Sequence, residues 1–337
     1  MQDTCAEKTI AVLGTGGTIA GRATAAGDNL GYRAAQLTVA DLLSAVPGLD
    51  AAAGGARIVV EQVAQLDSKD MDFPTWQRLA ARCARWLGDE AAQGIVVTHG
   101  TDTLEETGFF LQTVLAPAKP VVLASAMRPA TGLQPDGPQN LRDAVAVAAV
   151  AGASGVLAVN AGRVHGALAV RKQHTYRLEA FGSGEAGPLG VLEEGRLRRW
   201  QPWPRSEPLD GLALRRVLEA AALPRVEIVS SHADADGLLV EALLAQRRRQ
   251  PADDPRRLAG IVAAGTGNGT LHAALEAALV RAEAAGVVVW RATRCAEGAV
   301  LPVAGRPFGD AGELSPSKAR IALALDLLGA GSVWRKV

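Results

Sequence analysis

Two turns that carry threonine hold most of the side chains with which this sequence could do chemistry. One contains Thr101 and Asp102 after the apolar run 95–97, and the other contains Thr18 after the apolar run 9–13. Each apolar run predicts a buried strand, and residues at helical spacing predict a helix just after Asp102. Ligands bind at the carboxyl ends of parallel strands, and unpaired N–H groups at helix starts favour negative charge. We therefore expect a pocket that can hold a carboxylate or stabilise an oxyanion.

A hydroxyl in such a pocket could act as a nucleophile. Threonine is weakly nucleophilic unless a neighbouring base removes its proton. Asp102 adjoins Thr101, and a lysine with a desolvated ammonium could complete a Thr–Lys–Asp relay. The candidates are Lys172, in the irregular region after the fifth predicted strand, and Lys69, and the residues alone do not choose between them. The GxSxG motif of many hydrolases is absent.

Nucleotide and metal sites have little support. The glycine-rich turn that starts at Gly14 has Ile19 where the GxGxxG pattern needs glycine, and no Gly-Lys-Ser/Thr follows it. The five histidines lack HxxxH or HExxH spacing, and the three cysteines lack CxxC spacing. We therefore predict neither a metal nor an organic cofactor.

The composition predicts a globular protein of about two domains. The chain has 337 residues, of which 48% are hydrophobic and 21% charged. Its 35 basic side chains balance 35 acidic ones, which disfavours nucleic acid or an anionic membrane as a partner. A signal-peptide pattern and an apolar stretch of membrane-spanning length are both absent. With a sparse, odd set of cysteines, this predicts a cytoplasmic protein.

Alternation of strand and helix patterns predicts the α/β class with two α/β domains. A larger N-terminal domain, residues 1–200, should hold a largely parallel sheet flanked by helices. Residues 201–223, with a proline-rich start, read as a linker, and residues 224–337 as a smaller parallel-sheet domain. Shorter strands and turns are expected over residues 163–199. The predicted strands are 9–13, 56–63, 95–97, 120–124, 155–159, 226–229, 258–263 and 286–289, and the predicted helices include one capped by Asp70 and one over 137–151.

Five segments in chain order resemble the bacterial-type L-asparaginase family. They are GTGGTIAG, LDSKDMD, VVTHGTDTLEETGFF, ASAMRPATGLQPDGPQNLRDAV and AAGTGNGTL. The resemblance spans nearly the whole chain, and the two threonine motifs together are highly specific. It implies an amidohydrolase that converts L-asparagine and water to L-aspartate and ammonia through an acyl-enzyme, without metal or organic cofactor.

The resemblance also implies catalytic roles. Thr18 matches the family's primary nucleophile, and Tyr32 matches a tyrosine on the mobile loop after it. Thr101, Asp102 and Lys172 match a second triad, which favours Lys172 over Lys69. Residues 21–37 would close over the site as a lid. The residues by themselves leave open whether Thr18 or Thr101 forms the first bond.

The implied substrate contacts surround the two turns. Ser68 would receive the α-carboxylate, and Asp102 would pair with the α-ammonium. The N–H groups of Gly17 and Thr101 would form an oxyanion hole, and the Ala126 carbonyl would accept from the leaving amide. The full implied set is Gly17, Ser68, Lys69, Gly100, Thr101, Asp102, Ala126 and Asn268.

Some features of the resemblance concern assembly and substrate choice. Asn268 matches a residue lent to a neighbouring subunit, which implies a homodimer or homotetramer with shared active sites. Lys69 stands where relatives often carry glutamine or glutamate, so a cation beside the α-carboxylate pocket could change substrate choice. A partner carboxylate used by some members cannot be placed in residues 295–309. Disulfide positions of some secreted relatives fall on Asp89 and Pro117, in agreement with a cytoplasmic location.

Three alternatives to an asparaginase make different predictions. A dual glutaminase-asparaginase is close, because one methylene gives only about 1–3 kcal/mol of discrimination. An amidotransferase subunit for transfer-RNA amidation should carry a further N-terminal domain and a basic surface, but the glycine-rich turn starts at residue 14 and the net charge is zero. A non-catalytic amino-acid sensor should have lost one of Thr18, Thr101, Asp102 or Lys172, and all four are present.

Overall fold

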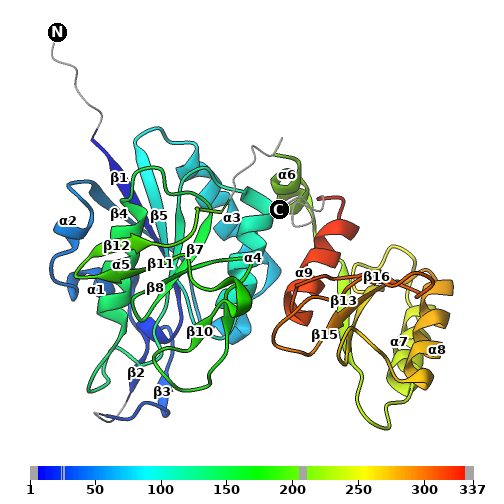
Figure 1. Cartoon of the computed structure of the whole chain (residues 1–337). Helices are drawn as coiled ribbons and strands as arrows, with labels where there is room; N and C mark the ends of the chain where they lie inside the picture. The colour runs from blue at the N-terminus through cyan, green and yellow to red at the C-terminus, as the bar shows by residue number, and fades with distance from the viewer. Residues whose placement is uncertain (1–6, 24, 26, 205–210, 331–337) are drawn as a thin grey trace. The chain divides into compact units, whose positions relative to one another are not determined.

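The computed structural model describes residues 7–23, 25, 27–204 and 211–330 (Figure 1). The chain forms two compact units, Met1–Asp210 and Gly211–Val337. Each combines a sheet with helices, so the predicted α/β class with a larger and a smaller domain is confirmed. The predicted linker 201–223 contains a helix, α6 (Leu212–Glu219), and its residues 205–210 lie outside the described residues. Cys5 also lies outside the described residues.

The N-terminal unit is built on an eight-stranded sheet in the order β12-β11-β8-β7-β6-β5-β1-β4. Its five strands from β4 to β7 are parallel, as predicted, and the hairpin-rich segment adds three antiparallel strands. The strands are β1 (Thr9–Gly16), β4 (Arg57–Leu66), β5 (Ala92–Thr98), β6 (Val121–Ala124), β7 (Val156–Asn160), β8 (Arg163–Gly166), β11 (Gly190–Glu193) and β12 (Arg196–Arg199).

Helices cover both faces of this sheet, which explains why its central strands are almost entirely buried and largely apolar. Every residue of β1 is buried. One face, which bears Ile10 and Val12, packs against α1 (Val39–Ser44), α2 (Leu49–Ala52) and α5 (Gly137–Ala148). The helices α3 (Phe73–Leu87) and α4 (Leu104–Leu115) lie on the other side of the sheet (Figure 1).

Two predicted helix ends need correction. Asp72, not Asp70, caps α3, because its carboxylate accepts from the Thr75 N–H, three residues on, while Asp70 lies in the 3-10 turn Ser68–Asp70. Pro74 in the first turn of α3 needs no hydrogen-bond acceptor and fits that position. The helix predicted over 137–151 ends at Ala148, shortly before a left-handed Gly152.

A buried hydrogen bond joins α3 to α4. The Trp76 indole Nε1 donates to Thr107 Oγ1 at 2.9 Å, and the Trp76 ring stacks on Phe110 with centroids 4.7 Å apart. Because Thr107→Val would leave the indole N–H buried without an acceptor, we expect it to lower the free energy of unfolding by about 1–3 kcal/mol. Urea unfolding measures this loss. In a Trp76→Phe background the same change should cost much less, and an equal cost in both backgrounds would contradict the hydrogen-bond explanation.

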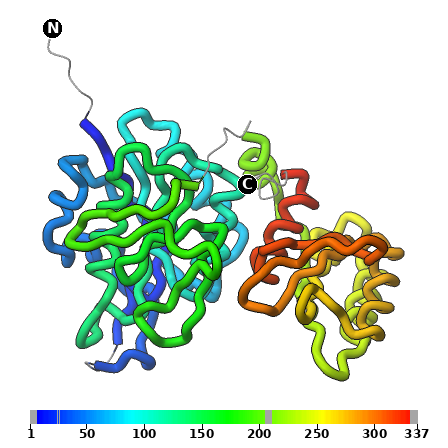
Figure 2. Tube along the Cα trace, in the orientation of Figure 1, coloured from blue at the N-terminus to red at the C-terminus, as the bar shows by residue number. Residues whose placement is uncertain are grey.

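Two short hairpins lie outside the eight-stranded sheet. One pairs β2 (Arg22–Ala23) with β3 (Tyr32–Arg33) and projects beyond the end of the sheet at which β1 finishes (Figure 2). The other pairs β9 (Arg171–Lys172) with β10 (Phe181–Gly182). Strands of two residues are too short for an alternating pattern to reveal, so the sequence predicted shorter strands and turns over residues 163–199 without their bounds, and a loop over residues 21–37.

The C-terminal unit holds a separate four-stranded sheet, all parallel, in the order β13-β14-β15-β16. The buried side chains of α7 and α8 form one apolar core with β13, β14 and β15, and α9 packs against the same three strands. The elements are β13 (Arg225–Ser230), α7 (Leu238–Arg249), β14 (Leu258–Gly265), α8 (Ala273–Ala284), β15 (Val288–Thr293), β16 (Gly309–Asp310) and α9 (Pro316–Leu327). Within the described residues, none of the helices is long and apolar enough to cross a membrane.

Candidate active site

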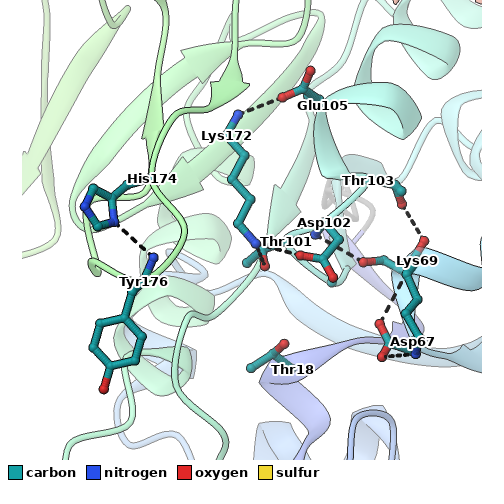
Figure 3. Close-up of polar contacts among 12 residues, drawn as sticks. Thr18, Asp67, Lys69, Thr101, Asp102, Thr103, Glu105, Lys172, His174 and Tyr176 are labelled. Carbon is teal, nitrogen blue, oxygen red and sulfur yellow. Dashed lines mark hydrogen bonds and ion pairs between the residues drawn. The ribbon is translucent and has the colours of Figure 1, made fainter. Parts of the chain in front are cut away.

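The two threonine turns lie side by side at one end of the sheet. Thr18 follows β1 and Thr101 follows β5, and these strands are parallel neighbours. The Thr15 hydroxyl donates to the Thr98 carbonyl at 2.7 Å and ties the two strand ends together. Figure 3 shows Thr18 and Thr101 in one region of the structure. The carboxyl ends of β1 and β5 therefore bring the two threonine turns together, as the sequence predicted.

Glycine permits the close approach of the two turns. Gly17 has a φ of 83°, and a Cβ there would lie 2.3 Å from the Gly100 nitrogen. A Cβ on Gly100 would lie 2.4 Å from the Ser68 hydroxyl oxygen. The segments that follow β1, β4 and β5 thus pack so closely that there is no room for a side chain at Gly17 or Gly100.

The Thr18 hydroxyl has a tyrosine as its partner. Thr18 begins the 3-10 turn Thr18–Ala20, is 8% exposed, and its Oγ1 lies 2.7 Å from the Tyr32 hydroxyl. Tyr32 reaches it from β3, in the projecting hairpin. The residue that sequence reasoning placed on a lid is therefore in contact with Thr18 in this structure.

The Thr101 hydroxyl has a lysine as its partner. The Lys172 Nζ donates to Thr101 Oγ1 at 2.8 Å and to Asp102 Oδ1 at 2.6 Å (Figure 3). Lys172 comes from β9, and its side chain is 20% exposed. An ammonium that is hydrogen-bonded to both a hydroxyl and a carboxylate can take part in proton transfer.

Lys69, the other candidate lysine, pairs with aspartates instead of with Thr101. Its ammonium pairs with Asp67 at 2.6 Å and with Asp70 at 3.4 Å, so it does not reach Thr101. The hydrogen bond and charge of Asp67 raise the pKa of the Lys69 ammonium. Of the two lysines left open by the residues alone, the structure brings only Lys172 to the threonine.

Ser68 is fixed against the Thr101 turn. Its side chain is buried, and its Oγ accepts from the Asp102 N–H at 3.2 Å. Its carbonyl accepts from the Thr103 hydroxyl at 2.7 Å. Ser68 and Asp102, the two residues expected to hold the ends of an amino acid, are thus hydrogen-bonded to each other.

The loop after β6 is held by two residues whose roles the sequence did not reveal. The Asp136 carboxylate accepts from the N–H groups of Met127 and Arg128 at 3.0 and 2.9 Å. The Asn140 Nδ2 donates to the Ser125 carbonyl at 2.9 Å. These bonds flank the fully buried Ala126, whose carbonyl was expected to face the leaving amide. The DGPQNL motif was visible in the sequence, but its contacts to main-chain groups were not.

The Gly17 amide has a partner within the protein. Its N–H donates to the Leu66 carbonyl at 2.9 Å, at the point where the register between β1 and β4 shifts. Its expected role toward an oxyanion stays a prediction. The Thr101 N–H keeps its expected role as a proposal.

Two buried histidines carry a ring nitrogen without a partner. His99 Nδ1 lies 2.7 Å from the Gly100 carbonyl, and because a carbonyl only accepts, Nδ1 carries the proton. His165 Nδ1 lies 2.8 Å from Ser183 Oγ. Among the described residues neither Nε2 has a hydrogen-bond partner. Desolvation by burial lowers the pKa of each histidine to about 4.

These histidines should make the protein less stable in mild acid. Their ordinary pKa is 6.5, so between pH 6.5 and about 4 the unfolded chain holds more protons than the folded one. Their contribution to stability is full above that window and is lost as the pH falls through it. From pH 7 to pH 5 each should lower the free energy of unfolding by about 2 kcal/mol. Urea unfolding at the two pH values measures this, and an unchanged pH dependence in His165→Gln would contradict it.

Asn268 makes its side-chain hydrogen bonds within its own unit. It belongs to the C-terminal unit, in the loop after β14. Its Nδ2 donates to the Leu301 carbonyl at 3.2 Å, and its Oδ1 accepts from the Leu301 N–H at 2.6 Å. Both ends of its amide are thus engaged within its own unit. In the part of the chain that is described, no three His, Cys, Asp or Glu side chains form a metal site.

Comparison with known proteins agrees with this geometry. The family model "Asparaginase, N-terminal" matches residues 9–204, and "Glutaminase/Asparaginase C-terminal domain" matches residues 225–336. A Haemophilus influenzae protein named "Probable L-asparaginase periplasmic" is 36% identical, covering 94% of this chain and 88% of the relative. "L-asparaginase 2" of Escherichia coli is 35% identical, with the same coverage of both chains.

A third relative and a solved structure extend the comparison. "Glutaminase-asparaginase" of Pseudomonas fluorescens biotype A is 33% identical, covering 93% of this chain and 84% of the relative. The crystal structure of a "Probable Cytoplasmic L-asparaginase" from Campylobacter jejuni superimposes with a TM-score of 0.85 at 33% identity. That match covers 97% of this chain and 98% of the other. With both family models matched over most of its length, this chain belongs to the asparaginase family.

Proposed function

We propose that this protein hydrolyses L-asparagine to L-aspartate and ammonia. The observation that carries the proposal is the pair of hydroxyl relays at the ends of two neighbouring strands. One joins Thr18 to Tyr32, and the other joins Thr101 to Lys172 and Asp102. The names of the relatives, several of them L-asparaginases, support the same reaction.

The reaction proceeds by double displacement. Thr18 Oγ1 forms a bond to the side-chain amide carbon, the C–N bond breaks, and ammonia leaves with a proton drawn through the relays. Water then adds to the resulting ester, aspartate departs, and the Thr18 hydroxyl is restored. Tyr32, at 2.7 Å, accepts the Thr18 proton while it releases its own phenolic proton toward the leaving nitrogen, and Lys172 exchanges protons with Thr101.

Substrate contacts follow from the same positions. Ser68 receives the α-carboxylate and Asp102 the α-ammonium, while the Thr101 N–H, next to Gly100, donates to the developing oxyanion. The Ala126 carbonyl accepts from the leaving amide. Lys69, neutralised by Asp67 and Asp70, sits beside the carboxylate pocket and tunes substrate choice.

We further propose an assembly and a location. Residues 1–200 hold the catalytic side chains, and residues 224–337 form the second domain. Two or four copies associate as a homodimer or homotetramer, in which Asn268 approaches the site of a neighbouring subunit. The protein resides in the cytoplasm, in keeping with the name of the Campylobacter jejuni neighbour, although the Haemophilus influenzae relative is named periplasmic.

The test is ammonia release from the purified protein with L-asparagine and L-glutamine side by side, at micromolar and millimolar concentrations. We expect strong release from asparagine and little from glutamine. Comparable release from both would favour a dual glutaminase-asparaginase, a name that the Pseudomonas fluorescens relative carries. No release from well-folded protein would instead favour an amino-acid sensor.

A further inference from the structure

Two carboxylates near the start of α4 hold the two ends of one lysine. The Asp102 carboxylate accepts from the Lys172 ammonium at 2.6 Å. The Glu105 carboxylate accepts from the main-chain N–H of the same lysine at 2.7 Å. Figure 3 shows the extended Lys172 side chain running between them, with Glu105 at one end and Thr101 and Asp102 at the other.

Lys172 needs such an anchor because its strand is weakly connected. It sits in the two-residue strand β9, which among the described strands pairs with β10 alone and is not part of the eight-stranded sheet. A lysine side chain has about 2 kcal/mol of rotamer entropy, so a bond at its ammonium alone leaves its main chain poorly fixed. Thr101, by contrast, follows directly from the buried β5.

We propose that Glu105 is a positioning residue for the reaction, fixing the main chain of Lys172 so that its ammonium meets Thr101. The inference rests on the proposed function, since it assigns Lys172 to a proton relay. The Glu105 side chain acts as a hydrogen-bond acceptor. It belongs to the first turn of α4, where a carboxylate is favourable for the helix. Residues at and just before the start of α4 thereby fix both the main chain and the ammonium of Lys172.

The test compares three variants in ammonia release from L-asparagine. Glu105→Ala removes the acceptor, and we expect kcat to fall by about 10- to 100-fold with KM little changed, because a shift of about 1 Å in a catalytic group is costly. Glu105→Gln keeps an oxygen that accepts from N–H and should restore kcat to within about threefold of the wild type. Glu179→Ala is the control, because it removes an exposed carboxylate from the loop between β9 and β10.

The outcomes separate positioning from other roles. Glu105→Gln as slow as Glu105→Ala would overturn the proposal, since charge rather than hydrogen bonding would then matter. An equal loss in Glu179→Ala, or a rise in KM at constant kcat, would overturn it as well.

A second measurement does not depend on activity. Amide hydrogen exchange over residues 171–173 should become at least about tenfold faster in Glu105→Ala and stay unchanged in Glu179→Ala. Unchanged exchange in Glu105→Ala would show that the bond does not hold the strand, and would overturn the proposal. If the wild type releases no ammonia, the proposed function fails, while the exchange rates still decide whether Glu105 holds Lys172.

Discussion

Thr18→Ala is expected to slow ammonia release from L-asparagine by at least about 10⁴-fold, the scale seen when a hydroxyl nucleophile is removed. Without Oγ1 no acyl-enzyme can form. The fold should be unaffected, because the Thr18 hydroxyl contacts the Tyr32 hydroxyl at the start of a 3-10 turn and is not part of the apolar core. Steady-state kinetics measure the loss, and urea unfolding should show a change within about 1 kcal/mol.

Two companion variants make this result specific. Thr18→Ser keeps a hydroxyl and should retain far more activity than Thr18→Ala. Thr101→Val keeps the shape of threonine but removes the partner of the Lys172 ammonium, and should also abolish most turnover. Near-normal activity in Thr101→Val would contradict the involvement of the second relay, whereas Thr18 would stay the nucleophile.

Gly17→Ala should also be damaging, with a loss of kcat of at least about 100-fold. Its Cβ would lie 2.3 Å from the Gly100 nitrogen, so the Thr18 and Thr101 turns must move apart. Gly17 also has a φ of 83°, at which a side chain costs about 1–3 kcal/mol of strain. Ammonia release and urea unfolding on the same preparation measure both effects.

Gly55→Ala is the matched control for this prediction. Gly55 has a φ of 84°, but no atom lies within 4 Å of the position of a Cβ there. It should therefore lose a similar amount of stability from backbone strain and keep its kcat. If Gly55→Ala loses activity as well, the loss in Gly17→Ala cannot be assigned to the contact with Gly100.

The sequence predicted the elements that depend on long apolar runs. Four of the five parallel strands of the first sheet, β1, β5, β6 and β7, are almost entirely buried, and a short apolar run in the sequence is enough to predict such a strand. The ends of helices were harder to predict from the sequence. Asp70 and Asp72 have the same side chain, and only the geometry of the turn Ser68–Asp70 decides that Asp72 caps α3.

Some site residues could also be predicted from the sequence and others could not. Thr18, Thr101 and Asp102 could be found because each directly follows a strand. Lys172 could not be preferred over Lys69 from the residues alone, because it contacts an aspartate 70 positions away in the sequence.

The residues that sequence reasoning missed act through main-chain groups. Glu105 accepts from the N–H of Lys172, Asp136 accepts from two N–H groups after β6, and His99 binds the Gly100 carbonyl. A main-chain group is present at every position, so no pattern of residue types records which one is bound.

The placement of Lys172 on a hairpin outside the main sheet has a consequence for how this scaffold can be altered. The lysine main chain is held by Glu105 and its ammonium by Asp102, and neither of these residues belongs to the loop that joins β9 to β10. The Tyr176 ring of that loop stacks on the Arg128 guanidinium at 4.1 Å, so Tyr176 ties the loop to the segment after β6. The exposed side chains of Arg177, Leu178 and Glu179 can therefore be exchanged while the proton relay stays in register with the nucleophile.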